Sequence, residues 1–347
     1  MLNSGRDVNR RNEDDAVSSS NEIPDDTEGA EDFLFNAVQQ SNNESVVRAS
    51  MDADADVNRT DNDGKTALFY AVQQSNNESV VRALIAAGAD VNRTDNDGKT
   101  ALFYAVQEWS NESVVRALIA AGADVNRTDN DGKTALFYAV QEWSNESVVR
   151  ALIAAGADVK ITDNEGKTAL FYAVQQRNNE SVVRALIDAG ADVNRTDNEG
   201  KTALFYAVQE WSNESVVRAL IDAGADVNRT DNEGKTALFY AVQQRNNESV
   251  VRALIDAGVD VNRTDNEGKT ALFYAVQEWS NESVVRALID AGADVNRTDN
   301  EGKTALFYAV QQRNNESVVR ALIDAGADVN ITDNEGENCF VLCCSTK

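Results

Sequence analysis

The chain has 347 residues, and its 58 Asp and Glu outnumber its 32 Lys and Arg, giving a formal net charge of −26 at pH 7. This excess of negative charge repels nucleic-acid phosphates and anionic lipids, so we expect neither a nucleic-acid nor a membrane partner. The sequence contains no His, which excludes Ser-His-Asp triads, Cys-His dyads and HExxH zinc sites.

The first segment, residues 1–31, is polar and lacks the apolar stretch of a secretory signal. No apolar run in the chain reaches the roughly 20 residues that a membrane helix needs. We therefore expect residues 1–31 to be a disordered segment. We also expect a protein that is not secreted and that resides in the cytoplasm or the nucleus.

Residues 32–336 consist of one unit that is copied with a period of 34 residues. The Thr of the segment GKTALFYAV recurs without slippage at Thr66, Thr100, Thr134, Thr168, Thr202, Thr236, Thr270 and Thr304. Eight complete units run to about residue 335, and a degenerate unit over residues 32–62 precedes them. The apolar face of one unit is too small to fold alone, so neighbouring units must stack.

Two short helices are predicted within each unit. In the unit 97–130, residues at helical spacing mark the first helix, namely Leu102, Ala105 and Val106. The second helix is marked by Val114, Val115, Leu118 and Ile119. Thr100 and Asn111 are suitable N-caps for the two helices, and Gly122 stands where a helix ends in a left-handed residue.

A polar segment, ADVNRTDNDGK, follows the second helix and has no helical period. Its Asn, Asp and Gly residues favour turns, which predicts a loop that protrudes between the helix pairs. Within the second helix, Glu112 and Arg116 are four residues apart and predict a stabilising ion pair.

The segments GKTALFYAV and VVRALIAAGADVN resemble the ankyrin repeat, whose unit opens with TPLH and closes with GADVN. The resemblance spans about residues 32–336 and implies an all-α solenoid of helix pairs with protruding β-turn (finger) loops. Ala101 replaces the Pro of the motif. Phe103 replaces its His, so the hydrogen bonds that this His makes between repeats are absent. A tetratricopeptide array shares the period but lacks the long non-helical segment.

The sequence contains no complete motif for phosphate binding or calcium binding. A phosphate-binding loop requires Gly five residues before Gly98, and a calcium loop requires an acidic ligand there, but Arg93 occupies that position. The sequons at Asn92 and Asn111 are interpreted as a turn and a helix cap. Because the carboxylates recur at polar positions, we interpret them as solvated. We expect no catalytic, cofactor or metal site, and no enzyme activity.

The family resemblance implies that a partner meets the loop tips and the exposed end of the first helix. The corresponding residues of one unit are Thr94, Asn96, Asp97, Lys99, Gln107 and Glu108. Trp residues in the helix-helix turns alternate with Arg in the later units. They are Trp109, Trp143, Trp211 and Trp279. These Trp side chains are candidate binding anchors, or they stack on the adjacent Arg residues.

The loops are almost identical in all complete units. Such a periodic surface suits a monomeric, non-enzymatic scaffold that binds a basic or neutral protein through many equivalent contacts. The alternative is a structural or unselected array, a decaying copy of a longer ankyrin-repeat gene. A surface that differed between copies would have favoured the scaffold more strongly.

The last segment, residues 337–347, breaks the unit after Gly336. Its clustered Cys339, Cys343 and Cys344 fit neither a disulfide framework nor a metal site, and its end lacks the aliphatic pair of a prenylation box. One codon choice for this segment, read without its first nucleotide, spells KTALFYAVQQ, which is the continuation that the repeat requires. We therefore interpret residues 337–347 as a truncated, frameshifted stub, a hypothesis that the gene sequence tests.

Overall fold

The computed structural model describes residues 34–39, 44–52, 55–74, 77–108, 111–142, 145–176, 179–210, 213–244, 247–278, 282–311 and 316–338. The expectations for residues 1–31 and for the cysteines of the last segment lie outside the described residues. The chain divides into two compact units, Met1–Asp90 and Val91–Lys347. The array boundaries drawn from the sequence remain predictions.

In the first compact unit, a helix over residues 34–39 precedes α2 (Glu44–Asp52), α3 (Ala67–Val72) and α4 (Glu78–Ala86). Both α2 and α3 pack against α4. The degenerate copy carries Ser50 where later copies have Leu, and this Ser is fully buried. Its Oγ donates to the carbonyl oxygen of Val46 at 2.9 Å, so the hydroxyl is satisfied, but its apolar contact area is smaller than that of Leu.

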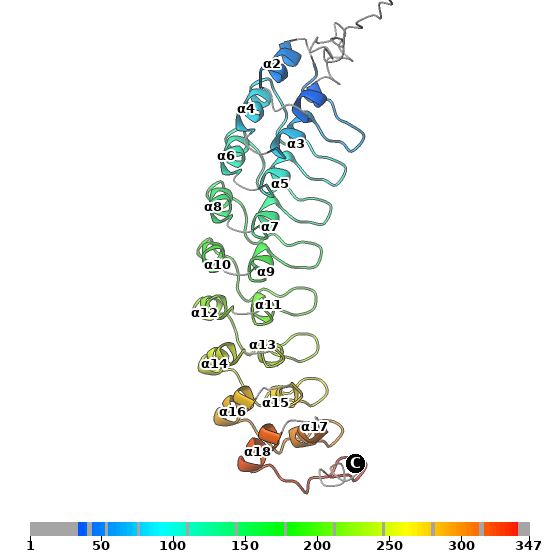
Figure 1. Ribbon diagram of the computed structural model, residues 1–347, viewed down its shortest axis with the longest axis vertical. Helices are drawn as coiled ribbons and strands as arrows, with labels where there is room; N and C mark the ends of the chain where they lie inside the picture. The colour runs from blue at the N-terminus through cyan, green and yellow to red at the C-terminus, as the bar shows by residue number, and fades with distance from the viewer. Residues whose placement is uncertain are drawn as a thin grey trace, which may run out of the picture. The chain divides into compact units, whose positions relative to one another are not determined.

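The second compact unit is a series of helix pairs, which Figure 1 shows as two rows. The first, inner helix of each pair is short: α5 (Ala101–Ala105), α7 (Ala135–Ala139), α9 (Ala169–Ala173), α11 (Ala203–Ala207), α13 (Ala237–Ala241), α15 (Ala271–Ala275) and α17 (Ala305–Gln311). The second, outer helices are α6 (Glu112–Ala120), α8 (Glu146–Ala154), α10 (Glu180–Asp188), α12 (Glu214–Asp222), α14 (Glu248–Asp256), α16 (Glu282–Asp290) and α18 (Glu316–Asp324).

Finger loops, the residues between an outer helix and the next inner helix (123–134 is one), project from the row of inner helices (Figure 1). Among the described residues there is no strand, only two isolated antiparallel bridges, Thr298 with Thr304 and Thr332 with Asn338. The expected all-α architecture of helix pairs and protruding loops is confirmed.

The core lies between the two rows of helices, as the apolar periodicity predicts. In α5, Leu102 and Phe103 are fully buried and only Tyr104 is half-buried. Each inner helix packs on the outer helix of its own pair and on the next inner helix, and the outer helices also stack in order. A helix of five residues is unstable by itself, so this packing rather than helix propensity holds it.

The C-terminal cap of the outer helix forms as expected. Gly122 has a φ of +88°. Its amide donates to the Ile119 carbonyl, and the Ala123 amide donates to the Leu118 carbonyl, both at 3.0 Å, which is the Schellman pattern. The predicted ion pair is also confirmed, because Arg116 Nε lies 2.7 Å from Glu112 Oε1.

The N-terminal caps differ from expectation. Thr100 and Asn111 do occupy the N-cap positions of α5 and α6, but neither side chain bonds to its own helix. The equivalent Asn213 instead donates from Nδ2 to the carbonyls of Val174, at 2.8 Å, and Ala207, at 3.3 Å. It thereby satisfies carbonyl groups that the ends of two successive inner helices leave free.

Three of the Thr residues in the GKTALFYAV segments have a hydroxyl without a hydrogen-bond partner. Among the described residues, the hydroxyls of Thr168, Thr236 and Thr304 are buried without a hydrogen-bond partner. The Phe that replaces the His of the motif cannot accept a hydrogen bond. Its ring instead packs edge-on against the next unit, with Phe103 and Tyr138 centroids 5.7 Å apart, so an aromatic contact links the units.

Candidate interaction surface

One aspartate organises each finger loop. Asp197 Oδ1 accepts hydrogen bonds from the amides of Glu199, at 2.9 Å, and Lys201, at 3.0 Å. The loop closes through the Asp197 amide, which donates to the Lys201 carbonyl at 2.9 Å, and the Gly200 amide, which donates to the Asp197 carbonyl at 3.1 Å. These bonds confirm the prediction that the polar segment after the outer helix, rich in Asn, Asp and Gly, forms turns.

These aspartates are buried, so the interpretation of all carboxylates as solvated is wrong. Each is only 6 or 7% exposed: Asp95, Asp129, Asp163, Asp197, Asp231, Asp265, Asp299 and Asp333. Burial of a carboxylate costs little free energy only when several hydrogen-bond donors reach its oxygens. The loop amides supply two of these donors, which is why the charge is tolerated inside a tight turn.

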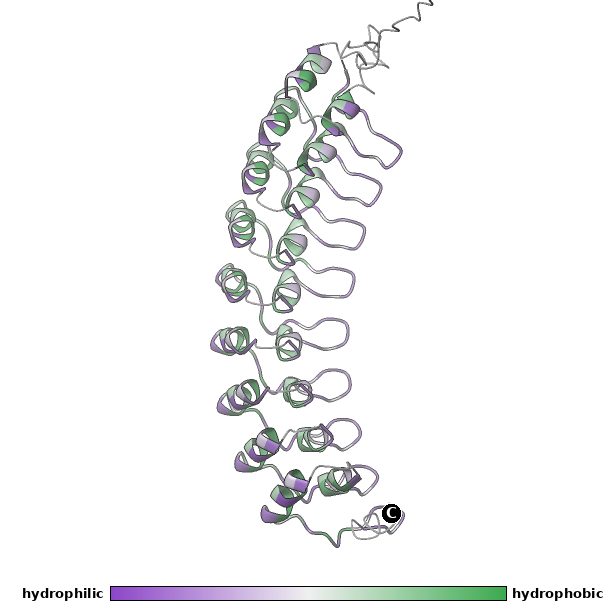
Figure 2. Cartoon of the chain, in the orientation of Figure 1, coloured by the Kyte–Doolittle hydropathy of each residue, from purple (hydrophilic) through white to green (hydrophobic). Residues whose placement is uncertain are grey.

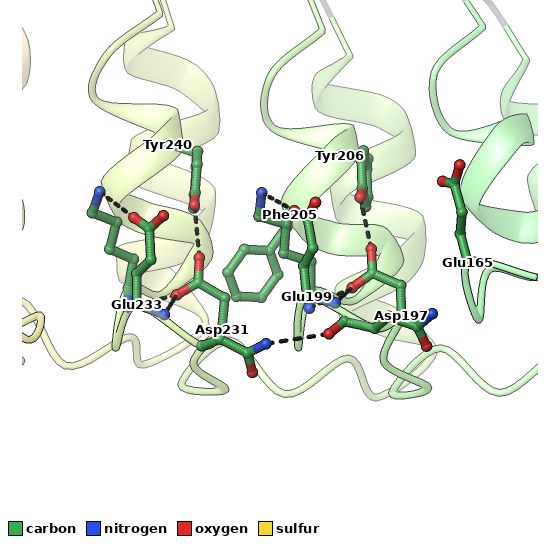
Figure 3. A network of polar contacts seen from close by, with 12 residues as sticks. Glu165, Asp197, Glu199, Phe205, Tyr206, Asp231, Glu233 and Tyr240 are labelled. Carbon is green, nitrogen blue, oxygen red and sulfur yellow. Dashed lines mark hydrogen bonds and ion pairs between the residues drawn. The ribbon is translucent and has the colours of Figure 1, made fainter.

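A tyrosine from the following inner helix supplies the third donor. The Tyr206 hydroxyl donates to Asp197 Oδ2 at 2.6 Å, and Tyr240 makes the same bond to Asp231 in the next unit (Figure 3). Burial, together with this hydrogen bond, raises the pKa of both tyrosines above the usual value. In the first compact unit the same two causes raise the pKa of Tyr70 to about 12.

Sequence reasoning missed this Asp–Tyr pair, although its signal is regular. The loop aspartate and the helix tyrosine are nine residues apart in every complete unit. The hydrogen bond of this pair joins the finger loop to the inner helix. The loop is thus stabilised by this bond as well as by the bonds within its own turn.

Lysine side chains connect the loops of successive units. Lys201 Nζ lies 2.8 Å from Glu199 Oε2 and 5.2 Å from the centre of the Tyr240 ring. The Lys201 side chain is only 19% exposed. Its ammonium group lowers the pKa of Glu199 through their hydrogen bond. Figure 3 shows the Phe205 ring between the two units, 5.8 Å from the Tyr240 ring centre.

Two ladders of asparagine side chains also run between units. At the loop tip, Asn232 Nδ2 donates to the Asn198 carbonyl at 3.2 Å, and the Asn232 amide donates to the Glu199 carbonyl at 3.0 Å. Nearer the outer helix, Asn194 Nδ2 donates to the Gly224 carbonyl at 2.9 Å, and Asn194 Oδ1 accepts from the Asp226 amide at 2.7 Å. Each finger loop is therefore fixed to its neighbour.

The sequon asparagines are structural. Asn111 is only 6% exposed. The Asn92 side chain donates from Nδ2 to the Gly122 carbonyl at 2.9 Å, and its Oδ1 accepts from the backbone amide of Asp124 at 2.7 Å. The side-chain amide of Asn92 is therefore engaged between units, and Asn111 is buried.

The structure places the predicted site residues in two groups. At the loop, Asn96 and Asp97 are exposed at the tip and Thr94 is half-buried. Lys99 is half-buried, and its Nζ lies 4.9 Å from the centre of the Tyr138 ring. Its side chain therefore contacts the next unit. The projecting parts of the finger loops are hydrophilic (Figure 2).

The second group follows the other end of the inner helix. Gln107 and Glu108 are half-buried residues just after α5, whereas the finger loop precedes it. A partner that contacts both groups must therefore cover the inner helix, where Tyr104 is the most exposed residue. The turn residues proposed as anchors, Trp109, Trp143, Trp211 and Trp279, lie outside the described residues.

The chemistry of the described residues is that of a polar surface. They include no group of three or more His, Cys, Asp and Glu side chains placed to hold a metal ion. None of the helices in the described ranges has the length and apolar character needed to span a membrane.

Comparison with known families gives a consistent result. A family model described as ankyrin repeats (3 copies) matches six overlapping ranges, 34–129, 110–163, 136–231, 181–265, 213–299 and 262–333. The comparison with curated proteins found no match. The family matches run from residue 34 to residue 333, across the helix pairs, the finger loops and their polar ladders. The chain belongs to the ankyrin repeat family.

Proposed function

We propose that this protein is a non-enzymatic scaffold that binds a protein partner through its finger loops, with each unit offering the same contact. Ankyrin repeats are in general protein–protein interaction modules. The observation that carries the proposal is the polar network that fixes every loop while leaving its tip exposed. Residues that are already ordered lose little conformational entropy on binding, which favours association.

The charge of the surface indicates the class of partner. The net charge is −26, and the tips of the later units carry an exposed Glu, whose side chain is 68% exposed at Glu199. We therefore propose a basic or neutral protein, whose association weakens as salt is added. Because the tips repeat in register, contacts to successive units add through effective concentration. The monomeric state and a location in the cytoplasm or the nucleus remain predictions.

The repeated units allow two series of variants, each removing the same number of charges, to be compared for partner affinity. A partner is first captured from an extract on the immobilised full chain, purified, and then titrated against variants. The tip series changes Glu to Gln in one, three or all of five units, at Glu165, Glu199, Glu233, Glu267 and Glu301. The control series removes an equal number of negative charges from the exposed ends of the outer helices. It changes Asp to Asn at Asp188, Asp222, Asp256, Asp290 and Asp324.

The tip series should lower the affinity step by step, whereas the control series should change it little, since distant charges are screened beyond about 10 Å at 0.1 M salt. Equal effects of the two series would show that only net charge matters. A single unit that accounts for the whole loss would contradict the multivalent surface.

A structural or unselected array is the second candidate. The observation in its favour is the near identity of the loops, because selection for one partner usually makes loop surfaces differ along an array. This candidate predicts that no captured protein responds to the tip series.

A further inference from the structure

The finger loops have two kinds of tip. The sequence contains the dipeptide Asp-Gly three times, at Asp63, Asp97 and Asp131, and each time it lies in a finger loop. In the later loops Glu takes the place of this Asp, as at Glu165. The tip side chains of Asp97, Asp131 and Glu165 are all exposed. The two kinds of tip therefore differ by one methylene group.

An exposed Asp followed by Gly can isomerise. The backbone nitrogen of the Gly attacks the side-chain Cγ of the Asp, a C–N bond forms, and the carboxyl oxygen leaves as water together with the amide proton. Gly has no Cβ to hinder this attack. Water then adds to the backbone carbonyl of the cyclic imide and breaks its bond to nitrogen. The product, isoaspartate, has the same atoms, but its main chain runs through Cγ and its former backbone carbonyl is a carboxylate.

The folded loop keeps the reacting groups in other bonds. The Gly132 amide donates to the Asp129 carbonyl at 3.0 Å, the bond that closes a β-turn. The Asp131 carbonyl accepts from the amide of Asn164 in the next loop, also at 3.0 Å. A Cβ on Gly132 would lie 3.0 Å from Asn164 Oδ1, so the next loop packs directly against this Gly. Ring closure consumes the proton of the turn bond, so the loop must open first.

The other tips have the same backbone arrangement. In the loop of Asp97, the Gly98 amide donates to the Asp95 carbonyl at 3.1 Å, and the Asp97 carbonyl accepts from the Asn130 amide at 3.0 Å. In the loop of Glu165, the equivalent two bonds are both 3.0 Å long. The loops therefore differ at the reacting side chain alone. With Glu the imide ring would contain one more atom, and such a ring forms far more slowly.

We propose that Asp97 and Asp131 are sites of spontaneous isomerisation to isoaspartate, that the loop bonds slow this reaction, and that the loops with Glu resist it. Isomerisation is slow compared with the opening of a loop, so its rate in the folded chain follows the fraction of open loops. The reaction requires neither a partner nor an enzyme, so it does not depend on the proposed scaffold function. It lengthens the turn by one backbone atom at the place where each loop bonds to the next.

The test uses a variant of the full chain with one Asp-Gly. Asp63→Glu combined with Asp97→Glu leaves only Asp131, and the later loops show that Glu fits this position. Trypsin then releases TDNDGK from residues 128–133 and TDNEGK from loops with Glu. Electron-transfer dissociation distinguishes Asp from isoaspartate at each position. Samples are kept at neutral pH and one temperature, in buffer or in concentrated urea. We expect isoaspartate at Asp131 in both, forming at least about 10-fold more slowly in buffer.

A pair of variants in this background tests the role of the loop bonds. Tyr138→Phe deletes the 2.6 Å hydrogen bond to Asp129 Oδ2, in the same loop as Asp131. It should raise the rate in buffer about 10-fold and leave the rate in urea unchanged. Tyr240→Phe deletes the equivalent bond to Asp231, also 2.6 Å long, in a distant unit. It should change neither rate, because neighbouring units carry most of the coupling in a repeat array.

Four results would overturn the proposal. The absence of isoaspartate at Asp131 in urea would show that the dipeptide is not a site. Its absence in buffer from both the background chain and Tyr138→Phe, after complete reaction in urea, would show that the folded protein is not modified. Equal rates in urea and buffer, or equal effects of the two Tyr variants, would show that these loop bonds do not control the reaction. Isomerisation of TDNEGK at the same rate would contradict the resistance of the loops with Glu.

Discussion

Removal of one tyrosine hydroxyl tests the loop network. Tyr206→Phe keeps the ring, whose centre lies 5.7 Å from that of Phe171 and 5.1 Å from Lys167 Nζ. It deletes the 2.6 Å hydrogen bond to Asp197 Oδ2. Asp197 is 6% exposed, so water cannot readily replace the lost donor. A hydrogen bond to a charged group contributes about 1.5 to 3 kcal/mol.

The lower half of that range applies here, because Asp197 Oδ1 keeps its two amide donors. We expect Tyr206→Phe to lower the local free energy of unfolding by about 1.5 to 2 kcal/mol. Stability in a repeat array is roughly a sum of unit and interface terms, so the loss should be centred on the altered unit. Native-state hydrogen exchange of the loop and of α11 measures it.

The matched control is Lys201→Met, which removes an ion pair to the exposed Glu199 and the contact of Nζ with the Tyr240 ring, and should cost about 1 kcal/mol. A double-mutant cycle of Tyr206→Phe with Asp197→Ala isolates the pairwise interaction. A change below about 0.5 kcal/mol for Tyr206→Phe would refute the conclusion that the hydroxyl secures the buried carboxylate.

Four further outcomes are expected. Thr168→Val should raise the free energy of unfolding by about 1 kcal/mol, because it removes a buried hydroxyl without a partner; a lower urea midpoint would contradict this. Gly200→Ala should destabilise more than Gly224→Ala, since both have positive φ but only the Cβ at 200 meets a side-chain oxygen, at 2.8 Å; equal urea midpoints would argue against the steric contact. The raised tyrosine pKa values predict stability that is fully present below the unfolded pKa of about 10 and is lost as pH rises through the folded values, because the folded chain then holds more protons; unfolding curves that stay unchanged up to pH ~12 would contradict it. Residues 44–52, with Ser50 in place of Leu, should exchange amide hydrogens sooner than the outer helices of later units, and equal protection would refute the expected fraying.

Local features of the fold were predictable from the sequence. The helix pairs, the glycine cap at Gly122 and the ion pair of Glu112 with Arg116 depend on residues at most a few positions apart, and periodicity encodes such contacts directly. Asn213 shows where this reasoning stops. One of its acceptors, the Val174 carbonyl, is 39 residues away and comes close only because the units stack.

The surface was predictable in part for the same reason. Asn96 and Asp97 are exposed at the loop tip, as a polar turn suggests. The contact of Lys99 with the Tyr138 ring was not predictable, because that ring belongs to the next unit. Asp95 was taken as solvated because composition alone does not show that Tyr104 and two loop amides reach its oxygens.

Hydrogen exchange at the finger loops of the full chain tests most directly whether they form a preordered, repeated surface. The amides that donate to the buried aspartates, such as those of Glu199 and Lys201, are the probes. Because the loops are almost identical in sequence, the measured exchange is an average over the equivalent amides of all loops. The account predicts slow exchange, within about a factor of 10 of the outer helices. Exchange at the rate of an unstructured chain would contradict it, since such loops would be ordered only on binding.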